Sequence, residues 1–198
     1  MSTAHTLVAR ACLIHVSFSA FNEGLCVDDE QLETRLHEYP LYQYAAQHWG
    51  IHARDGKTAL SEINELALNF IQNHAKVQAS IQVMELPSYR CHGYSQHYTK
   101  NVSGLQIDTS FGLCNVVQGL IDRGANATSK DDSGRTALHR AAENGHEAVA
   151  SILLLHQTTV DAIENRNGHT LLHLAVLNGH NVIVERLLTA SALTNVRP

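Results

Sequence analysis

Two stretches of the C-terminal half decide the fold: Thr136-Ala-Leu-His-Arg-Ala-Ala-Glu-Asn-Gly-His146 and Thr170-Leu-Leu-His-Leu-Ala-Val-Leu-Asn-Gly-His180. They begin 34 residues apart and share Thr, Leu, His, Ala, Asn, Gly and His at equivalent positions. A weaker copy precedes them over residues 103–121. A repeat of this length is typical of proteins that stack one helical unit on the next. The sequence therefore predicts a repeat array over residues 103–198.

The residue types within one unit predict a pair of helices. Gly134 ends a polar turn, and Thr136 is a good N-cap because its hydroxyl can pair with a free backbone N–H of the first helical turn. Leu138 begins a short apolar stripe, and Gly145 is suited to a left-handed helix end. Residues 149–154 give the second helix its apolar face. One unit cannot bury both faces alone, so the units must stack.

This pattern resembles the ankyrin repeat, which has a T-P-L-H-x-A motif and a period of 33 residues. The resemblance implies an all-α ankyrin-repeat solenoid of about three repeats. Their approximate bounds are 103–135, 136–169 and 170–198. The sequence departs from the motif at four places: Ala137 and Leu171 replace the proline, Gln106 replaces the histidine, and Asp108 replaces an alanine.

The N-terminal residues 1–85 show no such repeat and are predicted to form a helical segment, followed by an irregular linker over residues 86–102. Apolar residues recur at helical spacing in this region, and Asp28 is placed to cap one of the helices. The runs Ala11-Cys-Leu-Ile-His-Val-Ser-Phe18 and Tyr39-Pro-Leu-Tyr-Gln-Tyr-Ala-Ala-Gln-His-Trp-Gly-Ile-His-Ala-Arg54 resemble the helical segment that precedes the ankyrin array in fungal NACHT–ankyrin proteins of the NOD-like receptor type. The nucleotide-binding module of those proteins has no counterpart in this sequence.

Composition and motifs argue against several classes of function. The 198-residue chain has a formal net charge of −5, which does not suit direct nucleic-acid binding through a basic surface. Gly56-Lys57-Thr58 lacks the upstream glycine spacing and strand of a P-loop, and Cys91-His92 with His97 fits no established metal module. We therefore expect no enzymatic activity, cofactor, metal, membrane contact or small-molecule substrate. The expected location is cytoplasmic, with the nucleus as the alternative.

The predicted function is a non-enzymatic adaptor that binds another protein, as a short fungal relative or fragment of a NACHT–ankyrin signalling protein. The alternative is an ankyrin-repeat transcriptional co-regulator associated with a fungal metabolic gene cluster. The resemblance implies a binding face built by the turn tips and the first helix of each repeat, with residues that the fold does not require. These residues are Ser110, Phe111, Lys130, Asp132, Ser133, Arg135, Glu143, Asn144, Arg166, Asn167, His169, Leu177 and Asn178.

Overall fold

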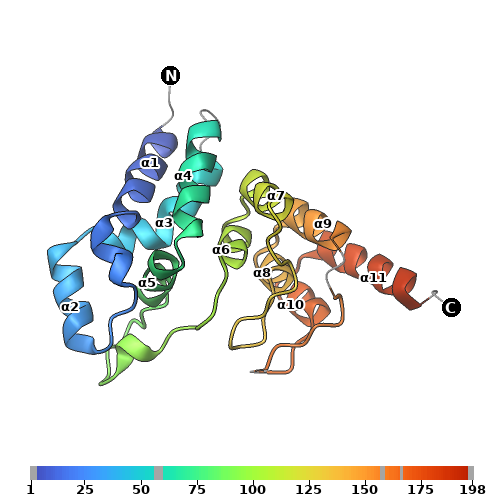
Figure 1. Cartoon of the computed structure of the whole chain (residues 1–198). Helices are drawn as coiled ribbons and strands as arrows, with labels where there is room; N and C mark the ends of the chain where they lie inside the picture. The colour runs from blue at the N-terminus through green and yellow to red at the C-terminus, as the bar shows by residue number, and fades with distance from the viewer. Residues whose placement is uncertain (1–3, 56–59, 157–158, 166, 196–198) are drawn as a thin grey trace. The chain divides into compact units, whose positions relative to one another are not determined.

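The computed structural model describes residues 4–55, 60–156, 159–165 and 167–195, which form helices joined by turns and loops with no β-strand among them (Figure 1). Gly56-Lys57-Thr58 and Arg166 lie outside the described residues. The chain divides into two compact units, residues 1–104 and 105–198. The predicted all-α class is confirmed.

The first unit contains five α-helices and two short 3-10 helices among its described residues. They are α1 (Ala4–Val16), η1 (Ser19–Glu23), α2 (Asp29–Glu38), α3 (Tyr42–Asp55), α4 (Leu60–Gln72), α5 (His74–Met84) and η2 (Tyr94–Gln96). Helix α1 packs against α3 and α4, and α3 packs against α5. Asp28 caps α2 as predicted, because its carboxylate accepts the Gln31 backbone N–H at 2.8 Å.

Aromatic side chains fill the core of the first unit. The rings of Phe21 and Tyr42 stack with centroids 3.8 Å apart, and Trp49 meets the Phe70 ring edge to face at 5.8 Å. Phe21, Tyr42 and Trp49 are fully buried and Phe70 is nearly so. Such aromatic pairs bury much apolar area per residue, so they anchor the unit.

The segment over residues 86–102 is attached to the first unit by side-chain hydrogen bonds. The Asp29 carboxylate accepts the backbone N–H groups of Gly93 and Ser95 at 2.7 and 2.9 Å. The Gln82 side chain joins Cys26 to the Ser95 carbonyl. Apart from η2, the segment has no regular secondary structure.

The second unit consists of three consecutive helix pairs, each with a first and a second helix. They are α6 (Gly104–Phe111) with α7 (Cys114–Asp122), α8 (Ala137–Asn144) with α9 (Glu147–Leu155), and α10 (Leu171–Leu177) with α11 (Asn181–Asn195). The first helices α8 and α10 lie side by side, the second helices α7, α9 and α11 form another layer, and the loops extend from the same ends of the helices (Figure 1). Leu138, Leu153, Leu171 and Ile183 are fully buried in the stack.

Candidate protein-binding surface

Threonine and histidine fix the start of each first helix in the second and third repeats. The Nδ1 atom of His139 accepts the Thr136 backbone N–H at 3.1 Å, and His173 makes the same bond to Thr170 at 3.2 Å. These bonds satisfy backbone donors at the helix start, as a capping box does. Burial lowers the pKa of His139 to about 4, with the Arg135 charge acting in the same direction, so the imidazole is neutral and can accept this bond.

Glycine and histidine fix the spacing between neighbouring repeats. The ring of His146 packs on Gly112 and its Nε2 atom bonds to the Ser110 carbonyl at 2.9 Å. One repeat later, the ring of His180 packs on Gly145 and bonds to the Glu143 carbonyl at 3.1 Å. A Cβ atom on Gly112 or Gly145 would come within 2.7 or 2.5 Å of the imidazole, and both residues have positive φ. Glycine is therefore required at both positions.

The loop tip before α8 is held by its own aspartate. The Asp131 Oδ1 atom accepts the backbone N–H groups of Ser133 and Arg135 at 3.0 and 2.9 Å, which closes the turn. The other carboxylate oxygen pairs with Arg140 at 3.2 Å. The next loop joins this one through the Asn165 backbone N–H, which donates to the Ser133 carbonyl at 2.8 Å.

An ion-pair network occupies the centre of the predicted binding face. Arg135 contacts Glu164 at 2.5 Å and Glu143 at 2.9 Å, and His169 lies 3.3 Å from Glu164. Burial acts to raise the pKa of Glu164, but the hydrogen bond and charge of Arg135 outweigh it and the pKa is lowered. Glu164 is 1% exposed, so this carboxylate is buried although it lies in a loop.

Arg135, predicted as a contact residue that the fold does not require, is engaged within the chain. Its guanidinium neutralises a carboxylate from the following loop, and such a buried charge is costly when it loses its partner. Glu143 and His169 belong to the same network. The sequence could not show this because Arg135 and Glu164 are brought together only when the repeats stack.

The predicted contact residues differ widely in accessibility. Six are exposed: Lys130, Asp132, Asn144, Asn167, Leu177 and Asn178. Five are half-buried: Ser110, Ser133, Arg135, Glu143 and His169. Phe111 is buried, at 7% exposed, so its ring is not an accessible contact. The accessible part of the predicted face is therefore smaller than the sequence suggests.

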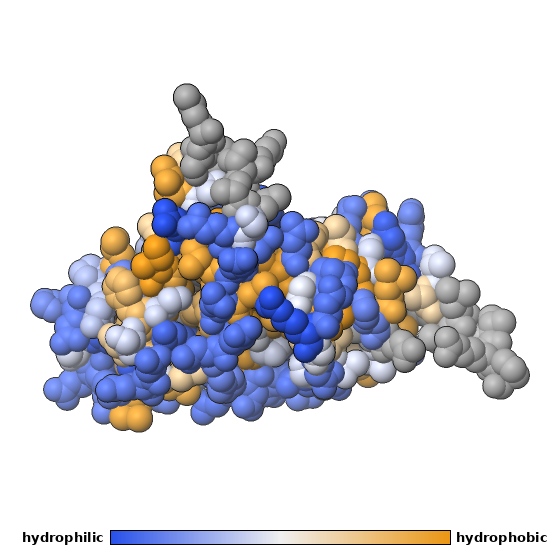
Figure 2. Space-filling model, turned by 45° about the horizontal axis from the view of Figure 1, so that its top comes forward, coloured by the Kyte–Doolittle hydropathy of each residue, from blue (hydrophilic) through white to orange (hydrophobic). Residues whose placement is uncertain are grey.

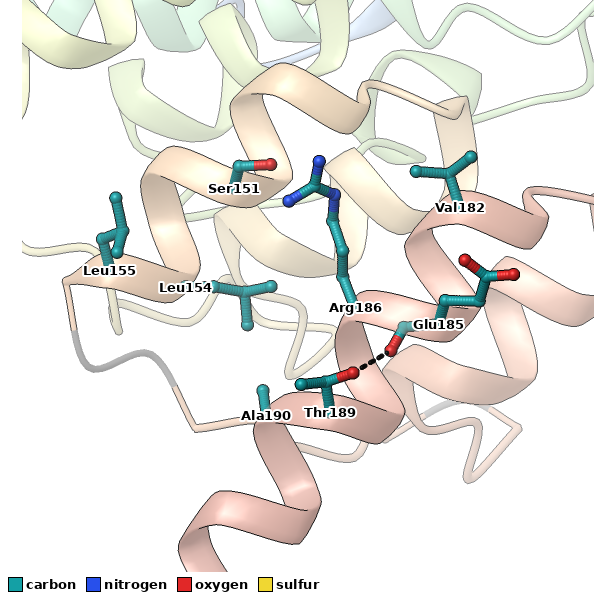
Figure 3. A pocket seen from close by; sticks show the side chains of 8 residues that line it. All are labelled: Ser151, Leu154, Leu155, Val182, Glu185, Arg186, Thr189 and Ala190. Atoms are coloured by element: carbon teal, nitrogen blue, oxygen red, sulfur yellow. Dashed lines mark hydrogen bonds between the residues drawn. The ribbon is translucent and has the colours of Figure 1, made fainter.

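Sequence reasoning did not single out Val176 or the groove between the second helices. Val176 is 59% exposed, whereas Ala142 at the equivalent position of α8 is fully buried. Val176 is a β-branched residue at a position where the second repeat has alanine, and this difference is the sequence signal that could have identified it. The groove has a volume of about 570 Å³ between α9 and α11 and is lined by Leu154, Leu155 and Val182 among others. Figure 3 shows Arg186 extending from α11 toward Ser151 of α9 at this groove.

The described residues were also searched for metal sites and for membrane-spanning helices. No group of three or more His, Cys, Asp or Glu side chains is arranged to hold a metal ion in the described part of the chain. None of the helices in that part has the length and apolar character needed to cross a membrane. On the face shown in Figure 2, hydrophilic residues cover much of the surface and hydrophobic residues are visible between them.

The comparison with family models agrees with the repeat pattern. Residues 105–197 match the family model described as ankyrin repeats (3 copies). Among solved structures, the chain is similar to the crystal structure of the human ASB11 ankyrin repeat domain, with 28% identity and a TM-score of 0.44. That match covers 45% of this chain and 40% of the other, so it spans less than half of either. A search of curated proteins finds no match.

Proposed function

We propose that the chain is a non-enzymatic adaptor that binds a partner protein on the loop tips and first helices of its ankyrin repeats. Ankyrin repeats form protein–protein interaction modules, and the three copies over residues 105–197 carry this general function. The observation that supports the specific face is Leu177, a leucine that is 67% exposed on α10 beside the exposed Asn178. An exposed apolar residue with polar neighbours is a common arrangement at binding hot spots.

The ion-pair network divides the predicted residues into two roles. Arg135 and Glu143 hold the loop before α8 in place, since both are engaged within the chain. The exposed Asp132 and Asn167 at the loop tips remain accessible for a partner. Direct contact is therefore assigned to the exposed residues, and the network acts as their support.

The experiment compares binding by the full chain with binding by two matched variants. Asp132→Ala, Asn167→Ala and Leu177→Ser together should remove the partners that the unchanged chain retains in quantitative affinity purification. Leu155→Ser is the control, because Leu155 is 82% exposed on α9, in the layer of second helices. Partners retained by the triple variant and lost by Leu155→Ser would place the site in the groove between α9 and α11 and contradict the proposal.

The proposal extends to the origin of the chain as a short fungal relative or fragment of a NACHT–ankyrin signalling protein. Its support is the Tyr39–Arg54 pattern, most of which lies in α3, where Ala45, Ala46 and Trp49 are buried in the first unit. The test is the neighbouring genomic sequence. A NACHT-coding region directly upstream is expected, and a metabolic gene cluster in its place would favour the co-regulator instead.

A further inference from the structure

An apolar pocket lies in the first unit, between α1 and the N-terminal end of α3. Its volume is about 480 Å³, within the range of about 300–1,000 Å³ typical of small-molecule sites. Leu7 and Phe18 line it from the side of α1 and Leu41 from the side of α3, and all three side chains are exposed. None of the described residues that line it is Asp, Glu, Lys or Arg. The pocket is therefore accessible, hydrophobic and free of carboxylates, ammonium groups and guanidinium groups among those residues.

The histidine and the cysteine of the pocket are uncharged at neutral pH. Burial lowers the pKa of His15, so its imidazole is neutral, and burial raises the pKa of the Cys12 thiol, so the thiol keeps its proton. A charged ligand would lose its hydration in such a pocket without gaining an opposite charge. The lining therefore favours an uncharged ligand.

Aromatic rings line the pocket from both sides. The His15 and Phe18 rings contact each other with their centroids 4.8 Å apart. On the side of α3, the Tyr44 ring is stacked on His48 at 4.4 Å and its hydroxyl is bonded to the His52 Nε2 atom at 2.9 Å. Aromatic rings prefer offset-stacked and edge-to-face contacts with other rings. The pocket is therefore better suited to a flat aromatic molecule than to a flexible aliphatic chain.

The His15 imidazole supplies a polar group that the fold leaves unused. Its Nε2 atom is buried and has no hydrogen-bond partner among the described residues. The χ2 torsion of histidine has two broad preferences about a half-turn apart, so either edge of the ring can be turned toward the pocket. A hydroxyl group on the ligand then gains a hydrogen bond that the chain by itself does not make.

We propose that this pocket binds an uncharged, planar aromatic small molecule whose hydroxyl group hydrogen-bonds to the His15 imidazole. A mostly apolar lining with one polar group that fixes orientation is the usual composition of a small-molecule site. The pocket lies on α1 and α3 and shares no residue with the loop-tip face, so this inference is independent of the proposed function.

The test compares three bicyclic probes by NMR titration of the isotope-labelled full chain at pH 7. 2-Naphthol is uncharged and carries one hydroxyl, naphthalene has no polar group, and 2-naphthoate is an anion. The shifts should centre on the methyl signals of Leu7, Val8 and Leu41. The Kd for 2-naphthol should be at least about fivefold lower than for naphthalene, which lacks the hydrogen bond, and at least about tenfold lower than for 2-naphthoate, whose charge is desolvated.

Two variants test the residues, each with a matched control. His15→Leu should abolish the preference for 2-naphthol over naphthalene, whereas His37→Leu, at an exposed histidine of α2 outside the pocket, should leave it intact. Ala11→Phe should fill the pocket and raise the Kd for 2-naphthol at least tenfold. Ile14→Phe enlarges an exposed residue of α1 that does not line the pocket, and it should change this Kd by less than twofold. Circular dichroism checks that each variant is folded.

Four results would overturn the proposal. The first is the absence of saturable shifts at the pocket with any probe. The second is 2-naphthoate binding as tightly as 2-naphthol. The third is a preference for 2-naphthol that survives His15→Leu or that is lost equally in His37→Leu. The fourth is tighter binding of N-acetyl-tyrosinamide, which carries peptide amides, than of 2-naphthol, because it would assign the pocket to a tyrosine side chain of a partner protein.

Discussion

Replacing Asp108 by alanine should stabilise the protein. Asp108 lies in α6, is fully buried, and has no hydrogen-bond partner for either carboxylate oxygen among the described residues. The equivalent residues of the second and third repeats are Ala141 and Ala175, which are also fully buried. The repeat geometry therefore accommodates a methyl group at this position, and the carboxyl group adds buried polarity with no compensating bond.

The size of the effect follows from these contacts. A buried polar group without hydrogen bonds costs about 1–3 kcal/mol, and replacing it by alanine removes this cost. The small cavity that alanine leaves is itself destabilising and offsets part of the gain in stability. A net stabilisation of about 1–2 kcal/mol is therefore expected for Asp108→Ala near pH 4, where titration of the carboxyl adds little. For a chain of this length, this corresponds to a rise in Tm of roughly 2–8 °C.

The gain should depend on pH. Burial raises the pKa of Asp108 well above its ordinary value, so the folded chain keeps a proton that the unfolded chain releases. Where the folded state binds more protons, the free energy of unfolding falls as pH rises, by about 1.4 kcal/mol per pH unit for one group. This destabilisation is absent below the pKa of the unfolded carboxyl and grows as pH rises toward the folded pKa. The advantage of Asp108→Ala should therefore be larger at pH 7 than at pH 4.

Urea unfolding followed by circular dichroism at 222 nm, at several values between pH 4 and pH 8, measures both effects. Asp122→Ala is the control, because Asp122 is an exposed acid on α7. It should shift stability by less than about 0.5 kcal/mol at every pH. A destabilised Asp108→Ala protein, or one whose advantage does not change with pH, would refute the reasoning.

Three further changes test the contacts within the array. Arg135→Met should lower the free energy of unfolding in urea by about 3 kcal/mol, because it leaves Glu164 buried without the arginine. A second change, Glu164→Leu, should restore most of the lost stability. A double variant as unstable as Arg135→Met would contradict the ion-pair account. The unchanged chain should lose up to about 3 kcal/mol of stability as pH falls from 6.5 to 4, because the pKa of His139 is about 4 in the folded state and the unfolded state takes up the proton first. His139→Gln should abolish this loss. His173→Gln, at an exposed residue, should leave the pH dependence unchanged. Gly145→Ala should lower stability by more than the roughly 1–2 kcal/mol of left-handed strain, since its Cβ would also meet the next imidazole, and a smaller loss in the same assay would show that the ring moves aside.

The sequence alone determined the repeat and the ends of its first helix. Thr136 and Gly145 lie at the two ends of one short helix, so the N-cap position and the positive φ follow from residue type and spacing. The stacking of three helix pairs also followed, because a single pair has no way to bury its apolar faces. The accessible members of the predicted binding face remain a prediction.

Only the tertiary structure decided which polar residues are engaged within the chain. Arg135 and Glu164 lie 29 positions apart, and their contact depends on how one loop packs on the next. The burial of the Asp108 carboxyl without a hydrogen-bond partner depends equally on which residues pack over it. Residue type and spacing determine the helix ends because the hydrogen bonds there join residues that are close in sequence. Burial and charge pairing depend on residues far apart in sequence, which come together only when the chain folds.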